Sequence, residues 1–329
     1  RYMSADAQTT TQSAHTAVPG QTVSKDEAIV VDNFSKSYGS RRVVDALQFT
    51  VHTGEVFALL GPNGAGKTTT VETLEGYRTP DQGSVRVLGL DPVRDAQALK
   101  PQIGVMLQQD GLYPGLTARE VLRLFAGYYR QAQPIDEMLE RVGLTSAAKT
   151  RCRRLSGGQK RRLALAVALI GNPRLVFLDE PTAGMDPQAR LTTWEIIRDL
   201  KRQGATVLLT THLMDEAERL ADRVAIIDSG RLIALDTPEQ MTGVQNATMI
   251  RFVAPAGLDC AVLAALPSAQ KADEVRPGSY VMEAEHVPAL LAELTAWLRD
   301  NNITLSELRV GHGSLEDLFL RLTGAEVRE

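Results

Sequence analysis

Two glycine-rich stretches of the sequence contain residue types suited to binding phosphate. The first, GPNGAGKTTT at residues 61–70, fits the pattern G-x-x-x-x-G-K-[ST] and lies between an expected strand at 56–60 and a helix beginning near Lys67. In this setting the backbone N–H groups surround phosphates, Lys67 reaches the β- and γ-phosphates, and the Thr68 hydroxyl is positioned for Mg²⁺. The stretch therefore predicts a site for a nucleoside triphosphate.

Two acidic residues follow the apolar run 175–178, which is expected to be a buried parallel strand. Such strands deliver their last residues to the sheet edge where ligands bind. There Asp179 is placed to hold Mg²⁺, and Glu180 is free to orient and deprotonate an attacking water. A helix-capping carboxylate explains one acid after a strand, but it does not explain the pair beside a phosphate loop.

Two further side chains each have a functional and a structural interpretation. His212 follows the expected strand ATVLLTT, so it would lie where the γ-phosphate is held. A single histidine is more often structural, but the phosphate loop favours a functional role here. Tyr38, in SKSYGS, either stacks on an adenine ring or is an exposed tyrosine of a turn. The residues alone leave both interpretations of Tyr38 open.

The second glycine-rich stretch is Ser156-Gly157-Gly158-Gln159, directly before the strong helix former KRRLALAVALI. Glycines that lead into a helix N-terminus favour an anion site, because free N–H groups and the helix dipole meet there. An ordinary capped helix explains the serine but not two successive glycines. Since the first loop already holds the phosphates of one nucleotide, the second site can serve a nucleotide bound to another subunit arranged head to tail.

The order of expected elements indicates two folded units after a polar tail. Residues 1–27 lack periodicity and are expected to be disordered. Strands and helices alternate over residues 28–243, which is typical of a parallel sheet covered by helices. Residues 244–329 are expected to run strand, helix, two strands, helix, strand, before a last short helix. That order predicts a small ferredoxin-like α+β domain.

The composition limits the classes of partner. The 329 residues carry a formal net charge of −4, which gives no electrostatic reason to expect a nucleic acid. The most apolar run, LALAVALIGNPRLVFL, is broken by Gly171, Asn172, Pro173 and Arg174, whereas a membrane-spanning helix needs ~20 predominantly apolar residues. If the chain acts at a membrane, we expect a partner to supply the span.

These motifs, in this order and spacing, resemble those of the ATP-binding subunits of ABC transporters. GPNGAGKTT is similar to the Walker A motif, LSGGQKRR to the signature, LVFLDE to Walker B, AGMD to the D-loop that contains Asp186, and TTH to the switch histidine. The resemblance covers about residues 29–243 and implies that Tyr38 stacks on adenine. It assigns ATP binding to Tyr38, Gly61, Pro62, Asn63, Gly64, Ala65, Gly66, Lys67, Thr68 and Thr69, and action on a partner's ATP to Leu155, Ser156, Gly157, Gly158 and Gln159.

The resemblance also implies a fold: a RecA-like P-loop core with an antiparallel β portion and a helical portion inserted near residues 111–163. The family's Q-loop glutamine usually follows a proline, but the stretch here is IGVMLQQDGLYPGLT. Both Gln108 and Gln109 are candidates, and counting from Ile103 and from Tyr113-Pro114 favours Gln108. By the resemblance, this glutamine contacts Mg²⁺ and senses the γ-phosphate.

Two later stretches, ALDTPEQM and GSLEDLFLRLTG, are similar to the daunorubicin-resistance-like ATPases, which work with ABC-2-type permeases. The resemblance implies an ATP- and Mg²⁺-dependent ATPase that powers a separate permease and exports drugs, antibiotics or other hydrophobic compounds. Every motif is present in this chain, so a homodimer with two ATPs at its interface suffices. The subunit would lie at the cytoplasmic face of the plasma membrane, with the permease docked near residues 108–124.

Three other interpretations compete with an exporter subunit. A soluble ABC ATPase of translation or DNA repair usually has two motif sets, basic segments or a long coiled coil, and the sequence contains none of these. An importer ATPase is disfavoured mainly by the C-terminal ending. A regulatory module would use residues 244–329 as a ligand sensor, whereas dimerisation or bracing is the simpler expectation for this domain.

Overall fold

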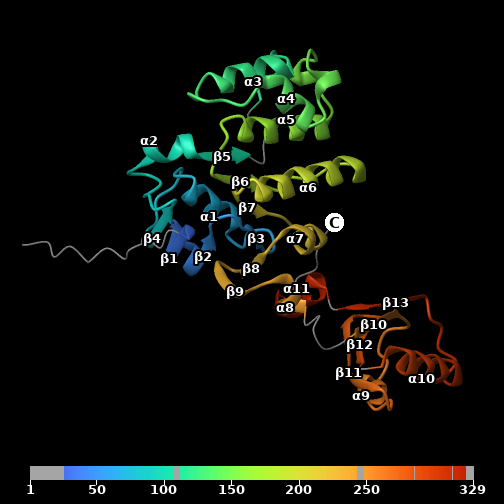
Figure 1. Cartoon of the computed structure of the whole chain (residues 1–329). Helices are drawn as coiled ribbons and strands as arrows, with labels where there is room; N and C mark the ends of the chain where they lie inside the picture. The colour runs from blue at the N-terminus through green and yellow to red at the C-terminus, as the bar shows by residue number, and fades with distance from the viewer. Residues whose placement is uncertain (1–25, 107–111, 243–247, 285, 313, 324–329) are drawn as a thin grey trace, which may run out of the picture.

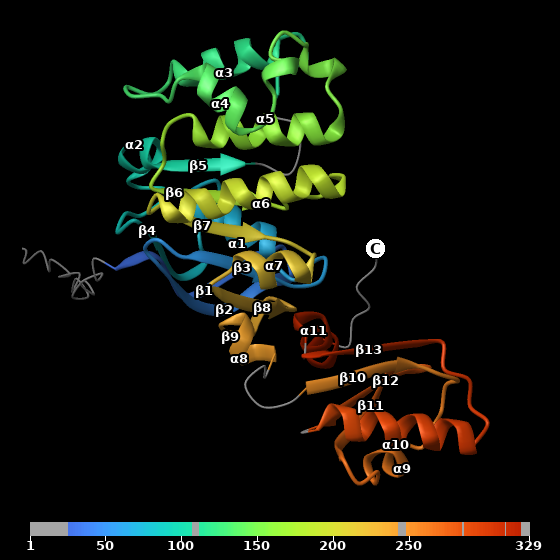
Figure 2. The same ribbon diagram turned by 45° about the vertical axis from the view of Figure 1, so that its right-hand side comes forward.

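The structure is a computed structural model that describes residues 26–106, 112–242, 248–284, 286–312 and 314–323. Figures 1 and 2 show a central layered part, a group of helices beside it and a smaller C-terminal unit. Most of the tail expected at residues 1–27 lies outside the described residues. Strand β1 already begins at Glu27.

The central element is a six-stranded sheet in the order β5-β6-β7-β3-β8-β9, in which only β9 pairs antiparallel. This arrangement confirms the parallel sheet predicted from the alternating pattern. The strands in this order are β5 (Ile103–Met106), β6 (Leu175–Asp179), β7 (Thr206–Thr210), β3 (Val56–Leu60), β8 (Arg223–Asp228) and β9 (Arg231–Asp236).

A three-stranded antiparallel sheet lies on one side of the central sheet, as the family resemblance implies. Its order is β2-β1-β4, formed by β1 (Glu27–Tyr38), β2 (Arg41–His52) and β4 (Gln82–Val87). The helices of the layered part are α1 (Lys67–Leu74), α2 (Ala96–Leu99), α6 (Pro187–Arg202), α7 (Met214–Leu220) and α8 (Pro238–Thr242).

Strand β3 is buried on both faces, and its side chains alternate between two cores. Val56, Ala58 and Leu60 belong to the core shared with the helices, whereas Phe57 and Leu59 belong to the core shared with the antiparallel sheet. A strand covered on both faces reads as a continuous apolar run, which is why VFALL gives no alternation. Burying each large apolar side chain stabilises the fold by about 1.5–3 kcal/mol.

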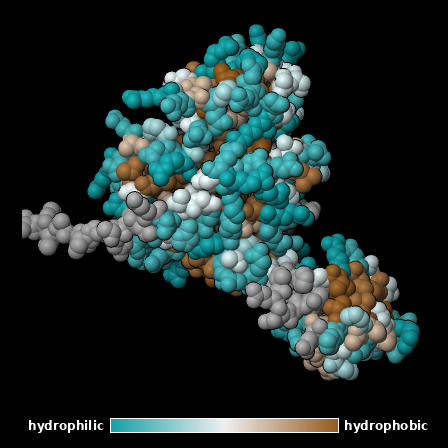
Figure 3. Space-filling model, in the orientation of Figure 1, coloured by the Kyte–Doolittle hydropathy of each residue, from teal (hydrophilic) through white to brown (hydrophobic). Residues whose placement is uncertain are grey.

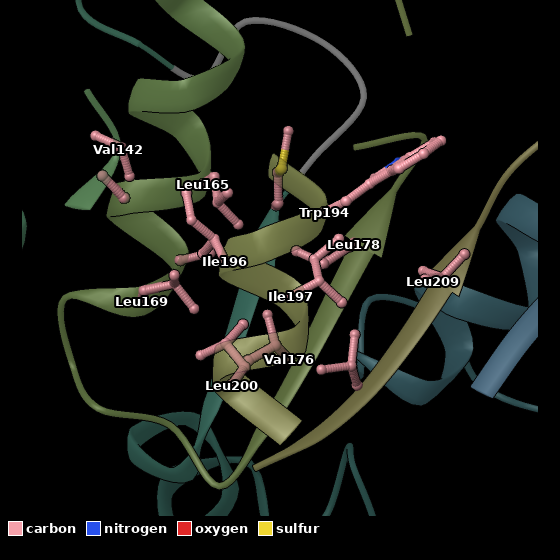
Figure 4. Packing of buried hydrophobic residues seen from close by; sticks show 14 of the residues in the cluster. Val142, Leu165, Leu169, Val176, Leu178, Trp194, Ile196, Ile197, Leu200 and Leu209 are labelled. Carbon is pink, nitrogen blue, oxygen red and sulfur yellow. The ribbon is translucent and has the colours of Figure 1, made fainter. Parts of the chain in front are cut away.

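In the helical core, helix α6 packs against strand β6, which leads to the acidic pair Asp179 and Glu180. Ile196, Ile197 and Leu200 of α6 belong to the same buried cluster as Val176 and Leu178 of β6, and Figure 4 shows Ile197 beside Leu178. All five side chains are less than 5% exposed. This packing fixes the end of β6, and with it the position of the residues that follow.

The inserted helices are α3 (Ala118–Ala126), α4 (Ile135–Arg141) and α5 (Gly157–Leu169). They form the layer drawn at the top of Figures 1 and 2. The insertion was expected to end near residue 163, but α5 continues to Leu169 because no helix breaker occurs before Gly171. Thr117 and Glu120 form a capping box that fixes the start of α3.

The C-terminal unit has the predicted strand-helix-strand-strand-helix-strand order. Its sheet order, β11-β12-β10-β13, is that of a ferredoxin-like fold. Figure 3 shows a hydrophobic patch on the face of this unit seen in that view. The elements are β10 (Thr248–Val253), α9 (Cys260–Ala264), β11 (Ala269–Arg276), β12 (Ser279–Ala284), α10 (Val287–Asp300) and β13 (Glu307–His312).

The last helix, α11 (Leu315–Thr323), packs on the layered part rather than in the C-terminal core. Leu315 and Phe319 are buried in the helical core together with residues of α7. The Leu315 N–H donates a hydrogen bond to the Glu218 carboxylate of α7. The chain therefore returns to the nucleotide-binding part after the C-terminal unit; a dimerising or regulatory role for residues 244–329 stays a prediction.

Candidate nucleotide-binding site

The phosphate loop connects β3 to α1, and its glycines are required by backbone geometry. A Cβ on Gly61 would lie 2.3 Å from the Ile227 carbonyl oxygen, and Gly66 has a φ of +102°. Gly66 is the N-cap of α1 and provides no side-chain cap. The first N–H groups of α1 thus keep their capacity to bind an anion.

Lys67 is held inside this loop. Its side chain is 9% exposed, and Nζ donates to the carbonyl oxygens of Gly61 at 2.6 Å and Pro62 at 3.1 Å. Burial lowers the pKa of Lys67, and the nearby carboxylates of Glu180 and Asp179 oppose that change. The ammonium group is therefore preorganised at the loop with acidic groups nearby.

The predicted acids lie at the carboxyl end of β6, facing the phosphate loop. A cavity of about 220 Å³ is bordered by both acids and by residues of the loop. The Thr210 hydroxyl, at the end of β7, donates a hydrogen bond to Asp179. Burial raises the pKa of Asp179, and this hydrogen bond opposes the rise. The described lining residues are Val43, Asn63, Gly64, Gly66, Lys67, Thr68, Thr69, Asp179 and Glu180.

The donors present fit Mg²⁺ bound together with nucleotide. Asp179 and Thr68 border the same cavity, so a carboxylate and a hydroxyl oxygen are available. Among the described residues, no cluster of three or more acidic, histidine or cysteine side chains could enclose a metal. Mg²⁺ prefers one or two carboxylates, with phosphate and water oxygens as its other ligands, so the sparse protein contribution suits this ion.

Glu180 and His212 meet across the ends of β6 and β7. His212 Nδ1 lies 3.3 Å from Glu180 Oε1. Hydrogen bonding to Glu180 raises the pKa of His212, against the effect of partial burial. Glu180 itself has a φ of +48°, and its N–H donates to the Thr210 carbonyl oxygen at 3.0 Å. The structure thus brings together the two residues that the sequence placed on separate strands.

Tyr38 is the last residue of strand β1 and lies near the phosphate loop. Its side chain is 41% exposed, and the guanidinium carbon of Arg78 lies 5.2 Å from the ring centroid. The hairpin that Tyr38 enters leads into β2, and a Cβ on Gly66 would lie 2.9 Å from the Val43 carbonyl oxygen of that strand. An exposed aromatic face is therefore available near the loop, and its use for adenine stacking stays a prediction.

The second glycine-rich stretch forms the exposed tip of α5. Ser156 is the N-cap and makes a capping box with Gln159, while Leu155 is 5% exposed and anchors the tip. A Cβ on Gly157 or Gly158 would meet no heavy atom of the described residues within 4 Å. Packing against the described part of the chain therefore gives no reason for either glycine.

The helix tip and the phosphate loop are separate within one chain. Of the described residues that line the phosphate-loop cavity, none belongs to 155–159. Figures 1 and 2 show α5 in the helical layer and α1 on the far side of the sheet. Asp186 is the N-cap of α6, where it accepts a hydrogen bond from Ala189 N at 3.0 Å. Gln108 and Gln109 lie outside the described residues.

Sequence reasoning missed three residues around the site: Thr210, Glu75 and Glu216. The Thr210 hydroxyl donates a hydrogen bond to Asp179. The sequence feature that could have indicated it is the pair Thr210-Thr211 at the end of a mostly apolar strand. Glu75, just after α1, is 6% exposed, and its Oε2 has no hydrogen-bond partner among the described residues. Glu216 is completely buried on α7. No local pattern distinguishes these two glutamates from surface acids of a helix.

A second, larger cavity of about 650 Å³ lies between the sheet and the inserted helices. Its border includes Met106, Leu112 and Phe125, together with Lys160 of α5 and Gly184 of the D-loop. The ring of Tyr128, which is 72% exposed, lies 6.1 Å from the ring of the bordering residue Phe125. Within the described parts of the chain, no helix combines the length and the apolar character needed to cross a bilayer.

Comparisons with known proteins agree with this geometry. The chain is 40% identical to the Nod factor export ATP-binding protein I of Paraburkholderia xenovorans (strain LB400), over 92% of this chain and 99% of that protein. It is 37% identical to the linearmycin resistance ATP-binding protein LnrL of Bacillus subtilis (strain 168), over 91% and 99%. The identity to the daunorubicin resistance ATP-binding protein DrrA3 of Streptomyces coeruleorubidus is 38%, over 92% and 98%.

Solved structures and a family profile point the same way. The fold is similar to the ATP-binding subunit of an ABC transporter, with a TM-score of 0.62 and 29% identity over 66% of this chain and 92% of that one. A dimeric ATP-binding cassette bound to ADP and Pi gives a TM-score of 0.59 and 26% identity, over 64% and 98%. The profile of the ABC transporter family matches residues 44–183. The chain therefore belongs to the ABC transporter family, as an ATPase subunit.

Proposed function

We propose that this subunit hydrolyses ATP in two composite sites, each formed by the phosphate loop of one protomer and the α5 tip of a second copy. The observation that carries this proposal is the separation of two phosphate-binding elements on one chain. The loop, Asp179 and Glu180 border one cavity, whereas the exposed tip at Ser156 and Gly157 faces open space. A head-to-tail dimer unites them, and a dimeric cassette is among the similar structures.

In each site the residues of one protomer have separate roles. Lys67 and the N–H groups of α1 bind the β- and γ-phosphates. Asp179 and Thr68 would hold Mg²⁺, which neutralises charge on the phosphate oxygens when it is bound. Glu180 accepts a proton from the attacking water. His212 lies within reach of Glu180 and senses the γ-phosphate.

The partner's helix tip closes the site. Its free N–H groups and the positive end of the α5 dipole favour the negative γ-phosphate. When the γ-phosphate leaves, this contact is lost and the dimer can open. Differential binding of ATP and ADP to the closed and open states is what converts hydrolysis into movement. By this scheme Tyr38 stacks on the adenine, and Gln108 senses the γ-phosphate and contacts Mg²⁺.

We infer that an integral-membrane permease of ABC-2 type docks at the larger cavity beside α3. The cavity lies next to the segment for which permease contact was expected, residues 108–124, and is bordered by Phe125 and Tyr129. It also reaches Gly157 and Gly184, so a permease segment seated there would adjoin both the α5 tip and the D-loop. This docking would hold the ATPase at the cytoplasmic face of the plasma membrane.

The relatives suggest a class of cargo. Their names concern export of Nod factor and resistance to linearmycin and daunorubicin. We propose that the permease exports antibiotics, drugs or other largely hydrophobic compounds. Cargo accumulation in membrane vesicles that contain the ATPase and its permease tests this assignment. Accumulation only of small polar solutes would contradict it.

Replacing Glu180 by glutamine tests the catalytic assignment. Glutamine keeps the shape of the side chain but cannot take the proton, so ATP binding should persist while turnover falls about 100- to 10,000-fold. ATP binding is measured by calorimetry and hydrolysis by phosphate release. Lys67→Ala serves as the comparison, since it should lose binding itself. Normal hydrolysis by the Glu180→Gln protein would remove Glu180 from this role.

A further inference from the structure

Glu216 is a buried acid that the scheme above does not use. It lies on α7, the helix that begins directly after the His212 segment. Its side chain is fully buried, and its Oε1 accepts hydrogen bonds from the Thr182 hydroxyl at 2.8 Å and from Trp194 Nε1 at 3.0 Å. The two donors are also buried, Thr182 completely and Trp194 to within 3%.

One carboxylate oxygen thereby joins three segments of the nucleotide site. Thr182 is two residues after Glu180, on the path to the D-loop. Trp194 is on α6, the helix that Asp186 caps at its start (Figure 4). Glu216 itself lies on α7, four residues after His212.

A carboxylate is a costly choice for this position. Its second oxygen, Oε2, has no hydrogen-bond partner among the described residues. Burial raises the pKa of Glu216, and the hydroxyls of Thr211 and Thr182 and the Trp194 indole oppose the rise. An apolar side chain would leave the buried Thr182 hydroxyl and Trp194 Nε1 without an acceptor, but a neutral glutamine could accept the same hydrogen bonds without burying an ionisable group. Stability alone therefore does not account for the acid.

We propose that Glu216 is a positioning residue for ATP hydrolysis, which holds the segment carrying His212 in register with the segment that follows Glu180. This inference rests on the roles proposed for Glu180 and His212. The side chains of Glu180 and His212 lie 3.3 Å apart and connect the two segments directly. The hydrogen bond between Glu216 and Thr182 is a second link between these segments. Misplacement of reacting groups by about 1 Å can lower a rate 100-fold.

The test compares three substitutions in the full chain, measured with Mg-ATP. Glu216→Met removes both accepted hydrogen bonds at nearly constant volume and leaves two buried donors unpaired, so the melting temperature should fall. Assayed well below that temperature, the variant should show a kcat at least tenfold lower with ATP affinity little changed. Glu216→Gln keeps an oxygen acceptor and should restore most of kcat. Asp215→Asn removes an exposed acid from the same helix and should hydrolyse ATP like the unchanged protein.

A second route breaks the same link from the other side. Thr182→Val is nearly isosteric and removes only the donated hydroxyl, so it should lower kcat in the same direction as Glu216→Met. Because both changes remove the same hydrogen bond, the kcat of the double variant should be only slightly lower than that of the more impaired single variant. Full activity of both variants, or losses that simply follow a lower melting temperature, would overturn the proposal.

Glu180→Gln measured in parallel separates this inference from the function on which it rests. Normal turnover by Glu180→Gln would reject the role of Glu180, whatever the Glu216 variants do. Blocked turnover by Glu180→Gln together with full activity of Glu216→Met would reject the positioning role alone.

Discussion

Lys67 shows how a single residue prepares the site for nucleotide. Its ammonium donates to two carbonyl oxygens of its own loop and lies near Asp179 and Glu180. A phosphate group can take over these donors without a change in the fold, because the backbone around Gly61 and Gly66 already has the required shape. Affinity then depends on exchanging hydrogen bonds to neutral carbonyl oxygens for hydrogen bonds to anionic phosphate oxygens.

Glu75 gives a pH-dependent prediction at the same scale. Burial, followed by the neighbouring charges of Asp179 and Glu72, raises its pKa from 4.5 to about 8. Between these two values the unfolded chain releases a proton that the folded chain keeps. The free energy of unfolding should therefore fall as the pH rises from about 4.5 to about 8, by at most about 1.4 kcal/mol per pH unit.

Glu75→Gln should remove this contribution, because glutamine does not titrate. The measurement is urea unfolding of nucleotide-free protein at a series of pH values, with Glu239→Gln on the exposed surface as the control. We expect the unfolding free energy of Glu75→Gln to decline less steeply with pH than that of the unchanged protein. Parallel curves would show that Glu75 ionises normally in the folded state.

The residues that could be predicted from sequence are those whose role is encoded locally. Lys67 and Thr68 follow from loop spacing, and Asp179 and Glu180 follow from their place after a buried strand. Thr210, Glu75 and Glu216 could not be found this way, because their partners come from distant parts of the chain. Glu216, for example, meets Trp194 and Thr182, 22 and 34 residues away.

At the scale of elements, the site is formed where strands end and helices begin. Strand β6 delivers Asp179, β7 delivers Thr210, and α1 begins at Lys67, after the phosphate loop that follows β3. Helix α5 begins at the exposed tip and is fixed by the Ser156 capping box. The sequence predicted these elements because apolar runs and caps are local signals. It misplaced the end of the inserted helices, since α5 joins the insertion to the core without a break.

The proposed permease contact is an element-scale prediction. Tyr128, just after α3, is 72% exposed beside the larger cavity. With the partly exposed Cys260 changed to serine, Tyr128→Cys should form a crosslink to the permease in membranes. A cysteine in place of Leu322, 41% exposed on α11, is the control and should crosslink much less. Crosslinks only through the C-terminal unit would contradict docking beside α3.

At the scale of the whole molecule, two arrangements follow from the chain's path. The phosphate loop and the α5 tip are kept apart, so the closure proposed for the site requires a second copy. Helix α11 returns from the C-terminal unit and thus contacts α7, the helix that directly follows the His212 segment. The order of the C-terminal elements was predictable, but this return was not, because the apolar face of α11 gives no sign of which core it joins.

The most direct measurement is the mass of the Glu180→Gln protein in solution by analytical ultracentrifugation, with ATP and with ADP. We expect a monomer that becomes a dimer with ATP and remains a monomer with ADP. A second substitution, Gly157→Asp, places a negative charge at the helix tip and should abolish the dimer while ATP binding persists. A Glu180→Gln protein that binds ATP yet stays monomeric, alone and beside its permease, would contradict the composite site.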